Sequence, residues 1–168
     1  MGFKKTSDLV AISFGLPESG ANTFTQEEIA LQLDILNNEI FVCVSCDLDV
    51  VSPDAIAATD TATSASVTST TQAAISNLSN TNCITTSSED IRAAGLVDGG
   101  VGFTRAAETV PSAKLDYIAL IATNNFFVQV QGTGNGVAKA VTGRLWGYRA
   151  RADASTYAAL VQSEVLSA

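Results

Sequence analysis

Apolar and polar residues alternate through much of this chain, which is the pattern of a β-strand with one face buried. Segment 28–35 alternates in this way, although residues 25–28 also fit a helix capping box. The longer alternation outweighs the short capping motif, so we expect a strand, followed by turn residues at 36–39. A second strand is expected at 40–50, where every second residue is apolar: Ile40, Val42, Val44, Cys46, Leu48 and Val50.

The last third of the chain carries the strongest strand pattern. Strands are expected at 115–122, 126–131 and 138–150, with asparagine-rich and glycine-rich turns between them. Asp153 then precedes apolar residues at helical spacing, ending near Glu164. This arrangement predicts a short C-terminal helix that Asp153 caps.

Residues 55–90 consist almost entirely of Ala, Thr, Ser, Asn and Ile. Such a bias fits either a disordered Ser/Thr stalk or strands with small side chains. The β-branched content and the alternation around Ser66 and Thr68 favour strands. Residues 88–95 combine a serine cap, an acidic first turn and a glycine stop, which predicts a short helix.

The first 24 residues contain Gly15, Pro17 and Gly20, which interrupt regular structure. We therefore expect residues 1–24 to form an irregular N-terminal arm that reaches neighbouring molecules. A chain of 168 residues is long enough for one domain that buries about 70% of its unfolded surface, and we expect 25–168 to form that domain. Several short strands with Gly/Asn turns and little helix predict an all-β fold, a β-sandwich or jelly roll.

Charge is distributed unevenly along the chain. Between Lys5 and Arg92 there is no lysine, arginine or histidine, but there are twelve of the 17 acidic residues. The rest of the chain carries all nine basic residues and a net charge of about +4. Phosphate binding needs clustered Lys or Arg, so no direct nucleic-acid binding is expected of the first half. The split suggests that like molecules meet, acidic surface to basic surface.

Charged residues make up only 15% of the chain. The surface is therefore expected to be uncharged polar or covered by other subunits, which indicates a homo-oligomer. The apolar stretch near the N-terminus is too short for a membrane span. Asp8 also breaks the continuous apolar region that a signal peptide needs. We expect the protein to be made in the cytoplasm and not exported by that route.

Three cysteines cannot form a closed disulfide framework. Cys43 and Cys46 form a C-x-x-C motif, but residues three apart in a strand point to opposite faces. A metal or redox pair is therefore disfavoured. We expect Cys46 to be a small buried residue and Cys43 to lie on the other face.

The chain contains no histidine, so Ser-His and Cys-His nucleophile arrangements are excluded. Asp47 and Asp49 would share a strand face, where two carboxylates could bind Ca²⁺ or act as acid and base. An exposed polar face is the favoured interpretation of this pair. The glycines at 99–102 lack the helix and lysine of a phosphate loop. We therefore expect no catalytic residue, no metal and no cofactor, and a protein that is not an enzyme.

A basic and aromatic cluster lies near the C-terminus. It could stack on single-stranded nucleic acid, but aromatic and arginine side chains are also favoured at subunit interfaces. We favour the interface, with at least one of the three arginines paired to a carboxylate from the first half of the chain. The candidate interface residues are Arg144, Trp146, Tyr148, Arg149 and Arg151.

The sequence resembles a known family of viral proteins. The runs LDYIALIATNNFFVQVQG from Leu115, TGRLWGYRA from Thr142 and YAALVQSE from Tyr157 are similar to the small major capsid protein of sphaerolipovirus-like viruses, which are icosahedral and contain an internal membrane. LQL from Leu31, EIFV from Glu39 and DLD from Asp47 extend the similarity over about 25–165. Haloarchaeal members are expected to be more acidic and poorer in cysteine, which indicates a host at lower salt.

This resemblance implies a single jelly roll that stands upright in a capsid. It also implies a second jelly-roll capsid protein as partner, pseudo-hexameric capsomers, possible contact with an internal lipid vesicle, and a location in the virion shell. The leading hypothesis is a structural capsid protein without catalysis. The alternatives are a β-sandwich binding module, either a virion spike or a carbohydrate-binding domain using Trp146 and Tyr148, and a decoration or tail protein of a tailed phage.

Overall fold

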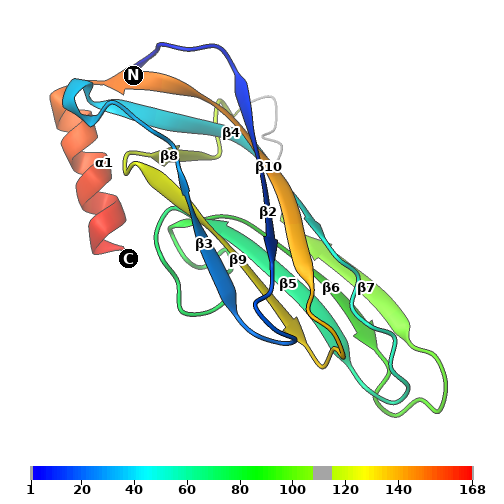
Figure 1. Cartoon of the computed structure of the whole chain (residues 1–168). Helices are drawn as coiled ribbons and strands as arrows, with labels where there is room; N and C mark the ends of the chain where they lie inside the picture. Colours follow the sequence, from blue (N-terminus) through cyan, green and yellow to red (C-terminus); the bar gives the residue numbers. More distant parts are fainter. Residues whose placement is uncertain (1, 108–114, 168) are drawn as a thin grey trace.

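The computed structural model describes residues 2–107 and 115–167, and it shows two antiparallel β-sheets packed as an elongated sandwich with one helix at the wider end (Figure 1). Sheet A has the order β1-β10-β4-β8, with β2 also paired to β10, and sheet B has the order β3-β9-β5-β6-β7. The strands of sheet A are β1 (Phe3–Lys5), β2 (Val10–Pro17), β4 (Glu39–Val50), β8 (Ala119–Ile121) and β10 (Ala140–Ala152). Those of sheet B are β3 (Thr25–Ala30), β5 (Thr61–Thr68), β6 (Cys83–Arg92), β7 (Val101–Ala106) and β9 (Asn125–Thr133), and the helix is α1 (Ala154–Leu166).

The strand pairing is that of a jelly roll. With β1 and β7 set aside as additions, the first remaining strand, β2, pairs with the last, β10. The second, β3, pairs with β9, the third, β4, with β8, and the two middle strands, β5 and β6, with each other. Strand pairs folded back in this way and divided over two four-stranded sheets define the jelly roll. The predicted all-β fold is confirmed.

The main hydrophobic core lies between the two sheets. Phe41 and Leu145 come from sheet A, and Phe126 and Val128 come from sheet B, all at 1% exposure or less. The ring of Phe14 meets that of Phe126 edge to face, with centroids 5.8 Å apart. Val67 of β5 is also fully buried in this core. Each sheet therefore contributes core residues from both halves of the chain.

A bulge in β4 exchanges the two faces of that strand. The pairing with β10 skips Val44, so the residues before it point the opposite way from a regular strand. Ile40 and Val42 therefore pack beneath α1 in a second cluster, whereas Phe41 belongs to the core between the sheets. Both faces of β4 are therefore buried at 40–43, one by the other sheet and one by α1. This explains why four consecutive residues there are apolar.

The bulge also overturns the expectation for the C-x-x-C motif. Because Val44 is the extra residue, Cys43 and Cys46 both point into the core between the sheets and both are fully buried. The prediction that Cys43 lies on the face opposite Cys46 is wrong. Burial raises the pKa of both thiols, that of Cys46 to about 12. A protonated thiol is a poor nucleophile and ligand, so both residues act as small core side chains.

The C-terminal helix begins where the sequence predicts. Asp153 caps α1, its Oδ1 accepting a hydrogen bond from Thr156 N at 2.7 Å. The helix packs Leu160 and Val161 against the outer face of sheet A at its wider end. The cap lowers the pKa of Asp153, chiefly through the Thr156 backbone N–H.

A buried carboxylate fastens α1 to the connection between β8 and β9. Glu164 is only 6% exposed and accepts a hydrogen bond from Ala122 N at 2.8 Å. Its other oxygen accepts from the N–H and the hydroxyl of Thr123. The N–H of the buried Ala122 would otherwise lack a partner, so Glu164 helps to determine where the helix docks.

Residues 88–95 do not form the predicted helix. Residues up to Arg92 belong to β6, which pairs with β5 on one side and β7 on the other. A helix cap is worth about 1 kcal/mol, whereas a central strand satisfies its backbone groups in two ladders. Gly95 follows the strand with a φ of +85°, so the glycine marks a turn rather than the end of a helix.

Part of the N-terminal segment also differs from the expectation. β2 pairs with β10 over eight residues, from Val10 to Pro17, so irregular backbone is wrong for this stretch. Pro17 is tolerated because it is the last residue of an edge strand, where no ladder needs its N–H. The division into an arm (1–24) and a domain (25–168) stays a prediction about the assembled protein.

Two predicted strands are shorter than expected. β3 ends at Ala30, and Gln32 then adopts a left-handed φ of +54°. Leu31 and Leu33 are nevertheless buried, so the alternation predicted burial correctly as far as Leu33, whereas Ile35 is 53% exposed. In the expected strand 115–122, only the three residues of β8 pair with β4.

Candidate interaction surfaces

The five residues predicted for an interface all lie on β10, but they do not form one patch. Arg144, Trp146 and Tyr148 line the outer face of sheet A. Arg149 turns the other way, toward the loop after β3, and Arg151 is exposed at the end of the strand. Each group therefore has different neighbours.

Arg149 closes one end of the core inside its own subunit. Its Nη1 lies 3.0 Å from Glu39 Oε1 in an ion pair, and it also donates to the Gln32 carbonyl oxygen at 2.8 Å. Its Nη2 donates to the Leu31 carbonyl oxygen at 2.8 Å. The predicted ion pair between a late arginine and an acidic residue of the first half is thereby confirmed. The guanidinium holds the loop whose left-handed turn ends β3.

Arg144 and Trp146 are held in place by their neighbours on the outer face of sheet A. The Arg144 guanidinium lies 5.7 Å from the centre of the Trp146 ring, and its Nε donates to Ser13 Oγ at 3.2 Å. The indole N–H of Trp146 donates to Asp47 Oδ2 at 3.3 Å. These three strands, β2, β10 and β4, thus present a preorganised polar surface.

Tyr148 lies two residues further along the same face of β10. Lys5 Nζ lies 4.9 Å from the centre of its ring, and the ring packs into the cluster beneath α1. Trp146 and Tyr148 therefore each have a cation over one ring face. That face is not open to a sugar, which weakens the case for an aromatic platform of the carbohydrate-binding kind.

Asp47 and Asp49 are both exposed on the same face of β4, as the alternation predicts. Within residues 2–107 and 115–167, no group of three or more His, Cys, Asp or Glu side chains comes together in a way that could hold a metal. Ca²⁺ takes about six to eight oxygen ligands in proteins, which is more than two carboxylates supply. The exposed polar face is the interpretation that the geometry supports.

A buried polar layer on the outer face of sheet B was not expected from the sequence. Gln129 is fully buried, accepts from Ser66 Oγ at 2.7 Å, and donates to Gln26 Oε1 and Thr68 Oγ1, both at 2.8 Å. A backbone N–H of the covering loop (residues 69–82) also donates to Gln26. The Ser/Thr/Asn-rich segment is thus held over the sheet, and Gln129, between two valines of β9, was the signal for it in the sequence.

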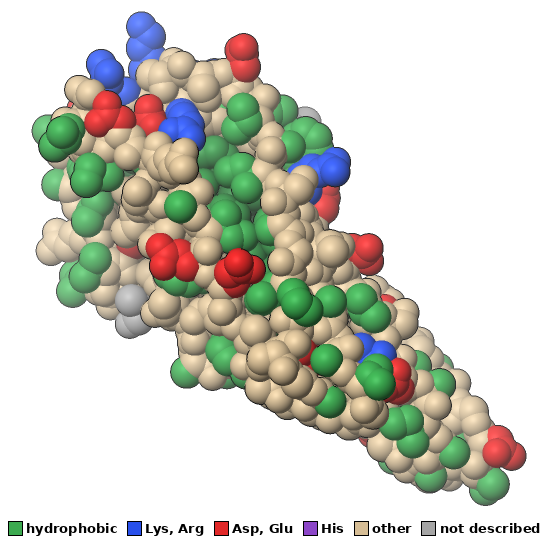
Figure 2. Space-filling model, viewed as in Figure 1, with side chains coloured by type: hydrophobic (Ala, Val, Ile, Leu, Met, Phe, Trp, Pro, Cys, Tyr) green, Lys and Arg blue, Asp and Glu red, His purple; other side chains and the backbone are tan. Residues whose placement is uncertain are grey.

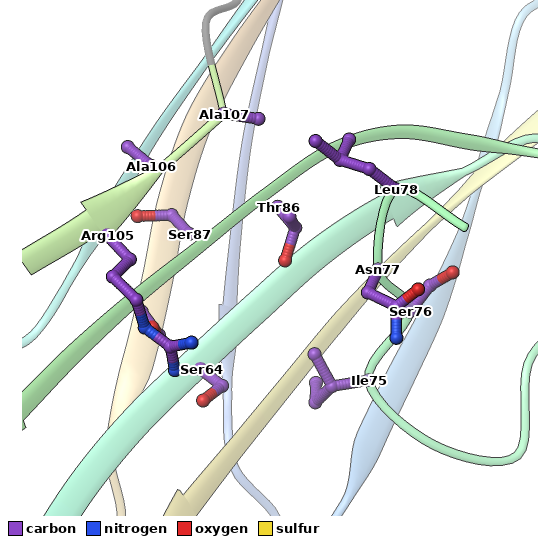
Figure 3. A pocket seen from close by; sticks show the side chains of 11 residues that line it. Ser64, Ile75, Ser76, Asn77, Leu78, Thr86, Ser87, Arg105, Ala106 and Ala107 are labelled. Carbon is purple, nitrogen blue, oxygen red and sulfur yellow. The ribbon is translucent and has the colours of Figure 1, made fainter. Parts of the chain in front are cut away.

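A groove of about 340 Å³ runs beside the covering loop. Figure 3 shows that small side chains of β5, β6 and β7 line it, with Ile75 and Leu78 from the covering loop and Arg105 reaching toward Ser64. Arg105 also lies 3.5 Å from Asp90 in an ion pair. The described lining residues offer mainly hydroxyl groups, the Asn77 amide, the Arg105 guanidinium and apolar side chains.

Charged side chains tie three loops together at one end of the sandwich. Glu18, 6% exposed, accepts from Lys139 N at 2.8 Å and from Gly132 N at 3.0 Å. Lys139 Nζ, itself 6% exposed, forms an ion pair with Asp54 Oδ1 at 2.6 Å, and Asn135 Oδ1 accepts from Asp54 N at 2.9 Å. The β2–β3, β4–β5 and β9–β10 connections are joined in this way. The signal in the sequence was the position of Lys139 on the apolar face of the expected strand 138–150.

The hydrogen bond from Lys139 lowers the pKa of Asp54 below its ordinary value, and the N–H groups of Gly136 and Val137 act in the same direction. A carboxylate whose folded-state pKa is depressed adds stability that is fully present above about pH 4 and is lost as the pH falls through the lower, folded-state pKa. We therefore expect Asp54→Asn to lower stability at neutral pH and to make the acid-side loss of stability shallower. Urea unfolding from neutral pH to about pH 2 measures this.

Lys139→Met provides the control for that experiment. Without the ammonium group, the Asp54→Asn substitution should change the acid-side slope less than it does in the wild type. An equal change in both backgrounds would contradict the assignment of Lys139 as the main cause.

Comparison with protein-family models, with curated proteins and with solved structures gave no match for this chain. None of the helices in the described ranges has the length and apolar character to cross a membrane.

Proposed function

We propose that this chain is a structural subunit of an icosahedral virus shell, which assembles with further copies of itself and with a second jelly-roll protein. The observation that carries the proposal is a jelly roll with large apolar side chains exposed at its ends and edges. Leu36, in the β3–β4 connection, is 92% exposed, Val97, in the β6–β7 connection, is 88% exposed, and Leu166, at the end of α1, is 75% exposed. Exposed apolar side chains on several sides are typical of a subunit whose surfaces are covered in an assembly.

The rest of the surface supports the same proposal. Uncharged side chains cover most of the face shown in Figure 2, and charged side chains are scattered among them. The exposed part of α1 carries no charge, since its single charged residue, Glu164, is buried. The resemblance to the small capsid protein of membrane-containing viruses supplies the further expectations of capsomers, an internal lipid vesicle and a place in the virion shell.

The mass of the purified protein tests this function. We expect analytical ultracentrifugation to find trimers, hexamers or larger assemblies that grow with protein concentration, and electron microscopy to show capsomers or shells when the second jelly-roll protein is added. A monomer at all concentrations, or a monomer that binds a glycan, would contradict the shell subunit and favour the binding module.

A further inference from the structure

Three edge strands lie on the same side of the sandwich. In the described part of the chain, β1 and β2 pair only with β10, and β3 pairs only with β9. Residues 18–24 connect β2 to β3, which lie next to each other on this side (Figure 1). The outer backbone groups of such strands have no ladder partner in the subunit, so this side is open to another chain.

Two cations oppose each other on this edge. Lys4 on β1 is directly across from Arg151 on β10, and both are exposed. Like charges in this position destabilise a strand pair. Glu39 lies across from Arg151 on the other side of β10, but its carboxylate is bonded to Arg149 and to the Asp34 N–H.

Lys4 and Arg151, the basic pair, therefore form no ion pair with a described residue. The neighbouring acid Asp153 is occupied as the cap of α1. On the face shown in Figure 2, most of the Lys and Arg side chains gather at this end of the molecule.

The edge strand β3 carries the opposite charge. Glu27 and Glu28, the acidic pair, are consecutive and exposed, and neither forms an ion pair with a described residue. Glu28 accepts one hydrogen bond, from Asn125 Nδ2 at 2.7 Å. The basic pair and the acidic pair thus lie on one side of the molecule, on different sheets.

Apolar side chains accompany the charges on this side. Leu9 and Val10 are 52% and 41% exposed, and Ile12 and Ile29 are only partly buried at the margin of the core. Figure 2 shows hydrophobic side chains in the hollow between the two sheets. Burying such a strip supplies affinity, whereas the charges at its margins select the partner.

We propose that this side of the sandwich is a self-association surface, in which the basic pair of one copy meets the acidic pair of a second copy. Two basic pairs repel each other, and so do two acidic pairs. The charges therefore favour only the arrangement in which a basic pair faces an acidic pair. An anionic membrane would attract the basic pair but repel the acidic pair, so a second copy fits the whole surface better. Two copies related by a two-fold axis make the contact twice. The inference rests on the self-assembly in the proposed function.

Charge reversal tests the inference. Variant one carries Lys4→Glu and Arg151→Glu, and variant two carries Glu27→Lys and Glu28→Lys. Each alone should self-associate at least about tenfold more weakly than the wild type, because all facing pairs then have like charge. An equimolar mixture should recover the association, since every acidic group of one variant again faces a basic group of the other. Ultracentrifugation of each sample at low and at high salt measures this.

Controls separate this contact from general charge and from folding. Asp49→Lys with Asp98→Lys changes the net charge as much as variant two, away from this surface, and should associate like the wild type. Circular dichroism melting establishes that each variant is folded. If a double charge reversal unfolds the protein, the double variant Lys4→Ser with Glu27→Ser replaces it. This variant should associate more weakly than the wild type, and its association should depend less on salt.

The outcomes distinguish the two proposals. A wild type that stays monomeric overturns the proposed shell function and this contact with it. If the wild type assembles and both variants assemble as strongly as the wild type, the contact alone is overturned. The same holds if the equimolar mixture of the two variants does not recover self-association. Binding of the wild type, but not of variant one, to phosphatidylserine vesicles, with self-association unchanged, would assign the basic pair to a membrane and overturn the contact as well.

Discussion

Replacing Phe126 by alanine is expected to lower the free energy of unfolding by about 3–5 kcal/mol, because the site lies in the centre of the core and cannot collapse. Phe126 has no exposed surface, and its ring meets Phe14 edge to face across the two sheets. The lost ring removes both the buried apolar area and this aromatic pair. Urea or thermal unfolding measures the loss, which approaches the whole stability of many domains.

Phe103→Ala is the matched control. Phe103 is also in sheet B, but it lies on the edge strand β7 with 52% of its surface exposed. We expect its loss to cost about 1 kcal/mol or less. Equal costs at the two positions would mean that the two sheets do not share the core described here.

Replacing Gly147 by alanine should lower the free energy of unfolding by about 2–3 kcal/mol through overpacking. Gly147 lies on β10 opposite the bulge in β4. An added Cβ would lie 2.5 Å from Cε1 of Phe41 and nearer still to the carbonyl oxygen of Val42. The second contact is with backbone, which cannot rotate away, so the bulge and its pairing with β10 must shift.

Gly102→Ala controls for the general effect of adding a methyl group to a strand. Gly102 lies on β7, has no positive φ, and an added Cβ would meet no atom within 4 Å. We expect a change within about 0.5 kcal/mol, and unfolding in urea compares the two variants directly. A Gly147→Ala protein as stable as the Gly102→Ala protein would contradict the close approach of β10 to β4.

The candidate surfaces could be predicted only in part. The sequence predicts that at least one of the three late arginines has an acidic partner, and Arg149 pairs with Glu39, because an arginine near the core margin needs a carboxylate or carbonyl oxygens. That Arg144 and Arg149 face opposite sides of sheet A follows from their odd spacing along β10. The basic pair could not be predicted, since Lys4 and Arg151 are almost the whole chain apart and meet only through strand pairing.

The sequence by itself determined the all-β class, the strands with clear alternation, and the helix that Asp153 caps, because periodicity and capping are local properties of the chain. Tertiary structure alone decided the rest. A single extra residue, Val44, reverses the faces of Cys43 and its neighbours, and two flanking strands turn the helix signals at 88–95 into β6. The sequence shows only that the segment between Lys5 and Arg92 lacks basic residues. Strand pairing places the basic pair on the edge of sheet A and the acidic pair on the neighbouring edge of sheet B. Register and pairing depend on partners far along the chain, and no local pattern encodes them.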